Sequence, residues 1–146
     1  MDNIKSVLFV CTGNTCRSPM AQVIFKSLAD KAGLPLSVMS AGIAVGGEGR
    51  PATNEAVQAV SRLGLDLSQH KTTSIRSLNT DETDLFVAMT MEHADVLMNL
   101  GIPKNKIYVM NIPDPFCGSQ EVYDACCKSI KAASEKLVEL IKENNG

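Results

Sequence analysis

The segment from Cys11 to Arg17 contains residue types that suit phosphate chemistry, at a spacing that places them in one loop. Gly13 and Asn14 tolerate positive φ, so the chain between the two ends can curl with several N–H groups pointing inward. Arg17 supplies a planar, permanently charged fork that matches two phosphate oxygens. The same surroundings stabilise a thiolate, the nucleophilic form of cysteine. The segment therefore predicts a phosphate cradle above a nucleophilic thiol.

A simpler interpretation of this segment is a buried thiol at a strand end and a surface charge at Arg17. The Cys-x5-Arg spacing alone leaves both interpretations open. The context of the segment favours the phosphate-binding interpretation, because the apolar run Val7 to Val10 precedes it and a helix start follows it. Ser18-Pro19 is typical of such a start, with Ser18 as the cap. A helix N-terminus favours a bound anion. An ATP-binding loop is excluded, since no Gly-Lys-Ser or Gly-Lys-Thr follows the glycine.

Phosphate ester hydrolysis also needs a group that protonates the leaving group and then takes a proton from water. Asp114 is the candidate, because Pro113 and Pro115 flank it and stiffen its loop. An aspartate beside proline is also a common turn residue, and the residues alone leave both roles open. Three other carboxylates are more typical of a solvated turn before a strand: Asp81, Glu82 and Asp84.

The elements that must position these residues follow from the apolar pattern. Four short apolar runs are typical of buried strands: 7–10, 36–39, 85–88 and 107–110. Segments with apolar residues at helical spacing occur at about 18–33, 54–64, 90–101 and 121–143. We expect Asn54 and Thr90 to cap two of these helices, and Leu63 and Leu140 to face the core.

Alternating strands and helices predict an α/β fold around a parallel sheet. We expect a three-layer sandwich with a four-stranded sheet in the flavodoxin-like order 2-1-3-4, one of the common orders of such sheets. No linker or repeat interrupts the sequence, so residues 1–146 are interpreted as one domain. In such sheets ligands bind beyond the carboxyl ends of the strands. The loops 11–18 and 111–119 both follow strands and are expected at one site.

Bulk properties narrow the classes of partner. The net charge of −2 gives no reason to expect nucleic acid or an anionic membrane. The run at 7–10 is too short for a signal-peptide core or a membrane span, so a cytoplasmic location is expected. The five cysteines and two histidines match no zinc pattern, and we expect neither a metal nor another cofactor. In a reducing cytoplasm the cysteines are expected as thiols.

The stretch Val10-Cys-Thr-Gly-Asn-Thr-Cys-Arg-Ser-Pro19 resembles the signature of the low-molecular-weight protein-tyrosine-phosphatase family. The likeness covers nearly the whole chain, with Ser40-Ala41-Gly42, the segment 66–70, Ala88-Met89 and Asp114-Pro115 in family order. It implies a Cys11 nucleophile that forms a phosphocysteine, a clamp by Arg17 and a general acid, Asp114. Phosphorylated proteins are the implied substrates and inorganic phosphate the product. The implied phosphate-binding residues are Thr12, Gly13, Asn14, Thr15, Cys16, Arg17 and Ser18.

The resemblance also implies supporting roles. Asn14, Ser40 and His70 form a hydrogen-bond network that braces the loop, and Ser18 donates its hydroxyl to the Cys11 sulfur. Cys16 can form a reversible disulfide with the nucleophile, although an inert thiol in the loop wall is the alternative. The remaining cysteines have no such role: Cys126 is expected in the core, and Cys117 and Cys127 are unassigned.

Substrate choice depends on the pocket wall. Thr15 stands where phosphotyrosine enzymes usually carry an aliphatic residue, and Phe116 where they carry tyrosine. The chain is more similar to the bacterial protein-arginine-phosphatase branch, although Cys117 stands where that branch tends to have glycine. Phosphoarginine is therefore slightly preferred over phosphotyrosine. One alternative is a thiol-dependent arsenate reductase, but such enzymes usually carry further cysteines just after the third strand, and this chain has none directly after residues 85–88. The other alternative is a non-catalytic phosphate-binding module.

Overall fold

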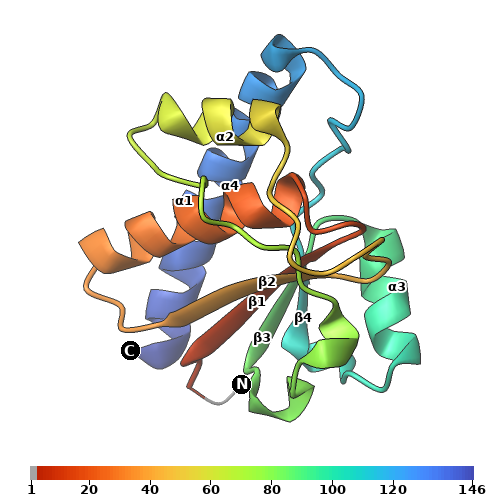
Figure 1. The fold of residues 1–146 in the computed structure, drawn as a ribbon. Coiled ribbons are helices and arrows are strands. Elements are labelled where there is room, and N and C mark those ends of the chain that lie inside the picture. The colour runs from red at the N-terminus through yellow and green to blue at the C-terminus, as the bar shows by residue number, and fades with distance from the viewer. Residues whose placement is uncertain (1–2) are drawn as a thin grey trace.

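The computed structural model describes residues 3–146 and has a four-stranded parallel sheet at its centre (Figure 1). The strands lie in the order β2-β1-β3-β4, which confirms the predicted 2-1-3-4 arrangement. The strands are β1 (Ser6–Cys11), β2 (Ser37–Gly42), β3 (Leu85–Ala88) and β4 (Ile107–Val109). The helices are α1 (Arg17–Lys31), α2 (Asn54–Ser61), α3 (Met91–Asn99) and α4 (Gln120–Asn145), with single 3-10 turns at 75–77, 80–82 and 104–106.

The strand register brings the candidate loops to one edge of the sheet. Cys11, the last residue of β1, pairs with Gly42 at the end of β2, and Val10 pairs with Ala88 at the end of β3. Ala88 in turn pairs with Val109 at the end of β4. All four strands therefore end at the same edge. The chain leaves β1 towards β2 on one side and returns to β3 on the other, so the loop after β1 lies at a topological switch point, where α/β sheets bind ligands.

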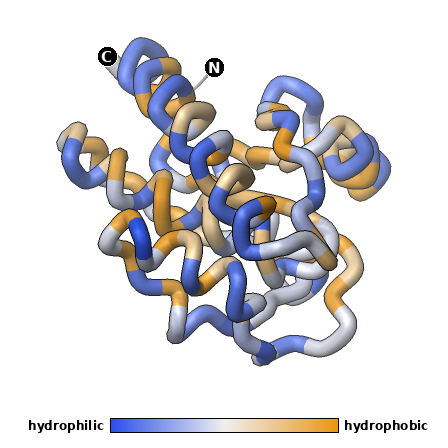
Figure 2. The backbone as a smooth tube through the Cα atoms, turned by 90° about the horizontal axis from the view of Figure 1, so that it is seen from above, coloured by the Kyte–Doolittle hydropathy of each residue, from blue (hydrophilic) through white to orange (hydrophobic). Residues whose placement is uncertain are grey.

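The helices form two layers, one on each face of the sheet. Helices α1 and α4 pack together over one face, with α2 against α4, and α3 lies on the other face (Figure 1). Neighbouring strand residues alternate between the two cores: Phe9 packs edge-on against Phe25 of α1, while Leu8 belongs with Leu97 of α3 to the second core. Figure 2 shows hydrophobic residues along the strands and alternating apolar and polar positions along the helices. The three-layer arrangement is as predicted.

Some helix details differ from the sequence expectations. Helix α1 begins at Arg17 with Cys16 at the N-cap and no side-chain cap, so the prediction of Ser18 as the cap is wrong. Thr53 rather than Asn54 caps α2, since its hydroxyl accepts the Ala56 N–H at 3.2 Å. Two further predictions are wrong, because the side chains reach the surface instead of the core: Leu63, 39% exposed, and Leu140, 41% exposed.

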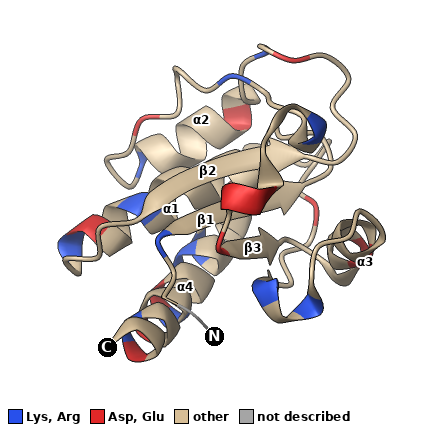
Figure 3. Ribbon diagram, turned by 90° about the horizontal axis from the view of Figure 1, so that it is seen from below, with Lys and Arg blue, Asp and Glu red and all other residues tan. Residues whose placement is uncertain are grey.

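Charged residues lie outside the sheet. Figure 3 shows acidic and basic positions interspersed along helices and loops, with the labelled strands β1, β2 and β3 free of both. Uncharged strands fit a sheet that is covered on both faces. Within residues 3–146, no helix is both long enough and apolar enough to cross a membrane.

The end of β2 packs unusually closely against the loop that follows β1. A Cβ atom on Gly42 would lie 2.6 Å from the Thr12 carbonyl oxygen and 3.0 Å from the Asn14 nitrogen, distances at which the backbone would have to move. The backbone here is also joined by hydrogen bonds, from the Ile43 N–H to the Cys11 carbonyl and from the Ala44 N–H to the Thr12 carbonyl. Only glycine allows this approach, so β2 shapes the loop directly.

Candidate active site

The loop between β1 and α1 joins a buried strand end to a helix N-terminus. Cys11 is 2% exposed, and Asn14 has a φ of 58°, in the left-handed region that asparagine tolerates better than most residues. Among residues 3–146, no backbone carbonyl accepts a hydrogen bond from the N–H groups of Gly13 to Cys16. Unpaired N–H groups that precede a helix form a site for an anion.

The side chain of Asn14 holds the loop in this shape. It is fully buried, and its Oδ1 accepts the backbone N–H of Thr73 at 2.8 Å. Its Nδ2 donates to Ser18 Oγ at 2.9 Å and to Ser40 Oγ at 3.0 Å. The Asn14 carbonyl oxygen accepts from Nε2 of His70 at 2.8 Å. The sequence grouped Asn14, Ser18, Ser40 and His70, and the structure brings all four together.

These bonds leave the Ser18 proton available to Cys11. Because the Thr73 N–H can only donate, it fixes which end of the Asn14 amide carries the oxygen. The amide nitrogen therefore donates to Ser18, whose hydroxyl proton remains for Cys11 Sγ, 2.8 Å from Ser18 Oγ. A hydroxyl donor at this distance stabilises negative charge on the sulfur.

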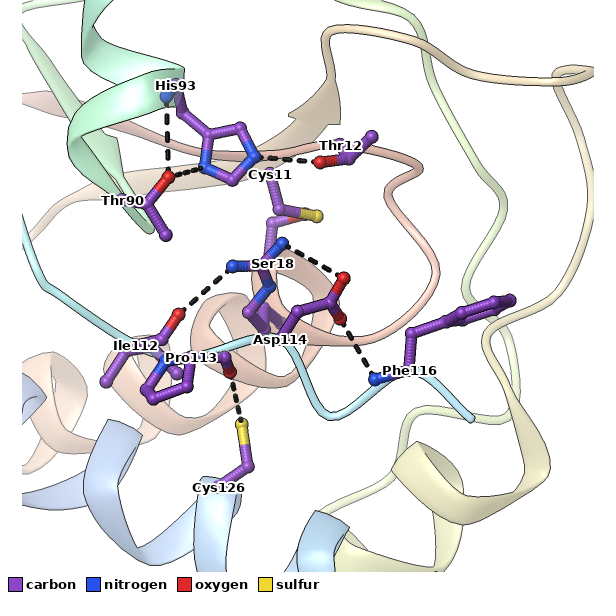
Figure 4. A network of polar contacts seen from close by, with 11 residues as sticks. Cys11, Thr12, Ser18, Thr90, His93, Ile112, Pro113, Asp114, Phe116 and Cys126 are labelled. Carbon is purple, nitrogen blue, oxygen red and sulfur yellow. Dashed lines mark hydrogen bonds and ion pairs between the residues drawn. The ribbon is translucent and has the colours of Figure 1, made fainter. Parts of the chain in front are cut away.

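Arg17 is a buried cation whose Nε has no hydrogen-bond partner among the described residues. Its side chain is 4% exposed, and Nη1 donates to the Ile112 carbonyl oxygen at 3.0 Å (Figure 4). Its Nη2 lies 3.7 Å from Oδ2 of Asp114. Its Nε is buried without a hydrogen-bond partner among residues 3–146. An unpaired buried donor costs about 1–3 kcal/mol, more when charged, so this atom favours an acceptor such as a phosphate oxygen.

Asp114 lies across the pocket mouth in the loop that follows β4. It is 51% exposed, and its Oδ1 accepts the Phe116 N–H at 3.0 Å, which fixes the carboxylate in a turn. A pocket of about 240 Å³ brings the candidate residues together, and its lining residues are Cys11, Thr12, Gly13, Thr15, Cys16, Arg17, Asp114 and Phe116. The other carboxylates lie elsewhere: Asp84 binds the N–H groups of Lys5 and Ser6 at the opposite end of β1.

All five cysteines are free thiols, and their surroundings differ. Burial, and then the neighbouring Cys11, raise the pKa of Cys16 to about 11. Burial also raises the pKa of Cys126 to about 12 and that of Cys127 to about 11, as expected for thiols in a core. Cys117 is exposed and has a φ of 65°, so the side chain stands at a backbone position that favours glycine.

Three residues that support the site were not identified from the sequence. The Thr73 N–H binds Asn14, Gln22 Oε1 accepts the Ser40 hydroxyl at 2.6 Å, and His93 Nε2 lies 2.9 Å from Thr12 Oγ1. Only His93 carries a local signal, because it follows the helix cap Thr90 by three residues at the carboxyl end of β3. The positions of Gln22 and Thr73 have meaning only once the strands are assembled.

Comparison with known proteins gives one family. The family described as low molecular weight phosphotyrosine protein phosphatase matches residues 6–146. The protein-arginine-phosphatase of Bacillus subtilis (strain 168) is 33% identical over 147 residues, which cover 94% of this chain and 92% of that protein. The low molecular weight protein-tyrosine-phosphatase YfkJ of the same strain is 29% identical over 152 residues, which cover 94% of this chain and 96% of that protein.

Solved structures agree with this assignment. A low molecular weight protein tyrosine phosphatase from T. tengcongensis has a TM-score of 0.88 at 34% identity, covering 93% of this chain and 99% of that chain. A mutant of the YwlE arginine phosphatase with a phosphorylated active-site serine has a TM-score of 0.87 at 30% identity, covering 95% and 97%. From its fold, its pocket and these relatives, the chain belongs to the low molecular weight phosphotyrosine protein phosphatase family.

Proposed function

We propose that this protein phosphatase hydrolyses phosphorylated side chains through a phosphocysteine on Cys11. The observation that carries the proposal is the set of groups around one pocket. Cys11 Sγ receives the Ser18 hydroxyl, Arg17 keeps a free Nε donor, and the Asp114 carboxylate lies beside the guanidinium. A module that only binds phosphate needs the arginine but neither the thiol nor the acid.

In the first step the Cys11 thiolate attacks phosphorus, and the bond between phosphorus and the leaving oxygen or nitrogen breaks. The electron pair of that bond goes to the leaving group, which takes a proton from the Asp114 carboxyl group. The loop N–H groups and Arg17 stabilise the charge on the three phosphoryl oxygens. The products of this step are the free side chain and a phosphocysteine.

In the second step the Asp114 carboxylate takes a proton from water, whose oxygen attacks phosphorus. The phosphorus–sulfur bond breaks, and Cys11 leaves as a thiolate that the Ser18 hydroxyl stabilises. Inorganic phosphate is released and Asp114 is again protonated. A covalent intermediate is supported by the related YwlE mutant, whose active-site serine is phosphorylated.

The nucleophile is tested by Cys11→Ser, with Cys117→Ser as the matched control at an exposed thiol outside the pocket. Serine lacks a stable anion at neutral pH, so we expect kcat for para-nitrophenyl phosphate to fall by roughly 10³-fold or more. Binding of inorganic phosphate, measured by calorimetry, should persist, and Cys117→Ser should retain its activity. A Cys11→Ser protein that still turns over would refute the nucleophile assignment.

The general acid is tested by Asp114→Asn on aryl phosphates whose leaving phenols differ in acidity. Asparagine cannot donate the proton, so we expect kcat to fall by about 10²- to 10⁴-fold for poorly acidic phenols. Strongly acidic phenols need little protonation and should be least affected. The measurement is the slope of log kcat against phenol pKa, which should steepen in the variant. An unchanged slope would assign the proton to another group.

For the substrate, we propose that phosphoarginine is preferred over phosphotyrosine. The pocket wall carries the hydroxyls of Thr12 and Thr15, and its one aromatic lining residue is Phe116, 62% exposed. Hydroxyls suit the N–H groups of a phosphorylated guanidine better than they suit a phenyl ring, which needs apolar contact. One relative is named for arginine and another for tyrosine, so both substrates belong in the test.

The preference is tested by Thr15→Ile, with Thr15→Ser as the control that keeps the hydroxyl. Isoleucine replaces a hydrogen-bonding group by apolar surface, so the ratio of kcat/KM for phosphoarginine peptides to that for phosphotyrosine peptides should fall about tenfold. Thr15→Ser should keep the ratio close to that of the unmodified protein. If Thr15→Ile leaves the ratio unchanged, Thr15 does not select the substrate.

We also propose that Cys11 and Cys16 form a reversible disulfide on oxidation. Both thiols line the same pocket, and burial raises the pKa of Cys16 to about 11, so Cys16 is a protonated thiol at pH 7. The reducing cytoplasm, where we expect the protein, would reopen the bond.

Dilute peroxide should therefore inactivate the enzyme, and a thiol reductant should restore it. Peptide mass spectrometry should find Cys11 linked to Cys16, while Cys16→Ser should lose activity irreversibly as its Cys11 oxidises further. Equal recovery of the two proteins would refute the protective role of Cys16.

A further inference from the structure

His93 is a buried imidazole beside the pocket for which the proposed chemistry has no use. It is the third residue of α3 and is 4% exposed. A buried histidine is usually held by its own helix or by the core. Here one ring nitrogen contacts the local helix cap, and the other reaches a residue 81 positions earlier in the chain.

Both ring nitrogens have partners. Nδ1 lies 2.9 Å from Thr90 Oγ1, and Nε2 lies 2.9 Å from Thr12 Oγ1 (Figure 4). Thr90 also caps α3, since its hydroxyl faces the His93 N–H at 3.5 Å. The imidazole therefore links the start of α3 to the residue that directly follows the nucleophile. Thr12 is itself exposed and lines the pocket.

The surroundings keep the imidazole neutral at pH 7. Burial lowers the pKa of His93, and the Arg17 guanidinium lowers it further, against smaller opposite effects of Glu92 and Asp114. A neutral imidazole has one donor and one acceptor nitrogen. Thr12 Oγ1 donates to His93 Nε2 in one tautomer and accepts from it in the other. In both cases Thr12 Oγ1 keeps a lone pair for a donor on the substrate.

We propose that His93 is a positioning residue that holds the Thr12 hydroxyl as a fixed hydrogen-bond acceptor for the N–H groups of a phosphorylated guanidine. This inference rests on the proposed function and extends the substrate selection beyond Thr15. Thr12, Cys11 and Asp114 line the same pocket, so the held hydroxyl and the proposed proton donor are both available to one substrate. Such an acceptor would orient a nitrogen-linked substrate, whereas an aryl phosphate has no N–H group to offer it.

The test compares two substitutions that each keep one half of the imidazole. In His93→Asn the amide takes the place of Nδ1 and retains the contact with Thr90, whereas in His93→Gln it reaches the place of Nε2 and retains the contact with Thr12. The readout is the ratio of kcat/KM for a phosphoarginine peptide to kcat/KM for para-nitrophenyl phosphate. Thermal unfolding of each variant checks the fold.

A neutral hydrogen bond corresponds to a factor of about three to ten. We expect the ratio to fall by this factor in His93→Asn and in Thr12→Val, and the double variant to show no further loss, because both changes remove the same oriented hydroxyl. Any loss that the two substrates share, such as weaker phosphate binding in Thr12→Val, cancels in the ratio. His93→Gln should restore most of the ratio, which a purely structural role for the imidazole would not explain.

Three results would overturn the proposal: an unchanged ratio in Thr12→Val, equal losses in His93→Asn and His93→Gln, or losses that multiply in the double variant. If His93→Asn does not fold, Thr12→Val still decides. Failure of the phosphatase chemistry itself is seen separately, as absence of para-nitrophenyl phosphate hydrolysis by the unmodified protein. That result, too, would overturn the inference.

Discussion

The buried amide of Asn14 is the interaction on which the site depends. A left-handed residue in the middle of the loop turns the backbone so that successive N–H groups remain unpaired, and the amide holds that turn against two other segments. Each of its bonds contributes only about 0.5–1.5 kcal/mol, but loss of the amide would leave several buried partners unsatisfied at once. The same amide donates to Ser18 Oγ, which leaves the Ser18 proton available to the Cys11 sulfur. The shape of the loop and the hydrogen bonding of the proposed nucleophile thus depend on one side chain.

The site also depends on the sheet, which brings Arg17 and Asp114 to the same edge without joining them in a tight ion pair. Arg17 is buried and tied to the Ile112 carbonyl, whereas Asp114 is half exposed on a separate loop. Their 3.7 Å separation is longer than a tight ion pair, and the guanidinium keeps a free donor. A phosphate can therefore bind Arg17 while the carboxyl group stays available for proton transfer.

The sequence was sufficient to predict those features whose residues lie next to one another in the chain. The strand segments, the loop from Cys11 and the aspartate between two prolines could all be predicted, because each depends on residues that are neighbours in the chain. The strand order was expected because it is common in such sheets. The Ser18 cap was wrong because its hydroxyl is drawn to Cys11 and Asn14, which a local rule for helix starts does not include. Thr53 and Asn54 are both good caps, and only the path of the backbone decides between them.

The residues that were missed act across long separations in the sequence. Thr73 contributes a backbone N–H, which has no side-chain signature, and Gln22 acts on Ser40 from a half-buried position on α1. Leu63 and Leu140 follow an apolar pattern, but nothing packs over them where they reach the surface. The spacing of apolar residues shows which face of a helix is apolar. It does not show how far the elements packed against that face extend along the helix.

The close approach of Gly42 to the loop has a consequence for the order of folding. The loop is complete only when the end of β2, the segment around Thr73 and Ile112 have all reached it, and the longest of these contacts, between Arg17 and Ile112, spans 95 positions in the chain. Long loops close late, because their entropy must be offset by structure already formed. We therefore expect the loop to be assembled among the last parts of the molecule. Until then, Cys11 is a thiol on a chain that cannot yet bind a phosphate group.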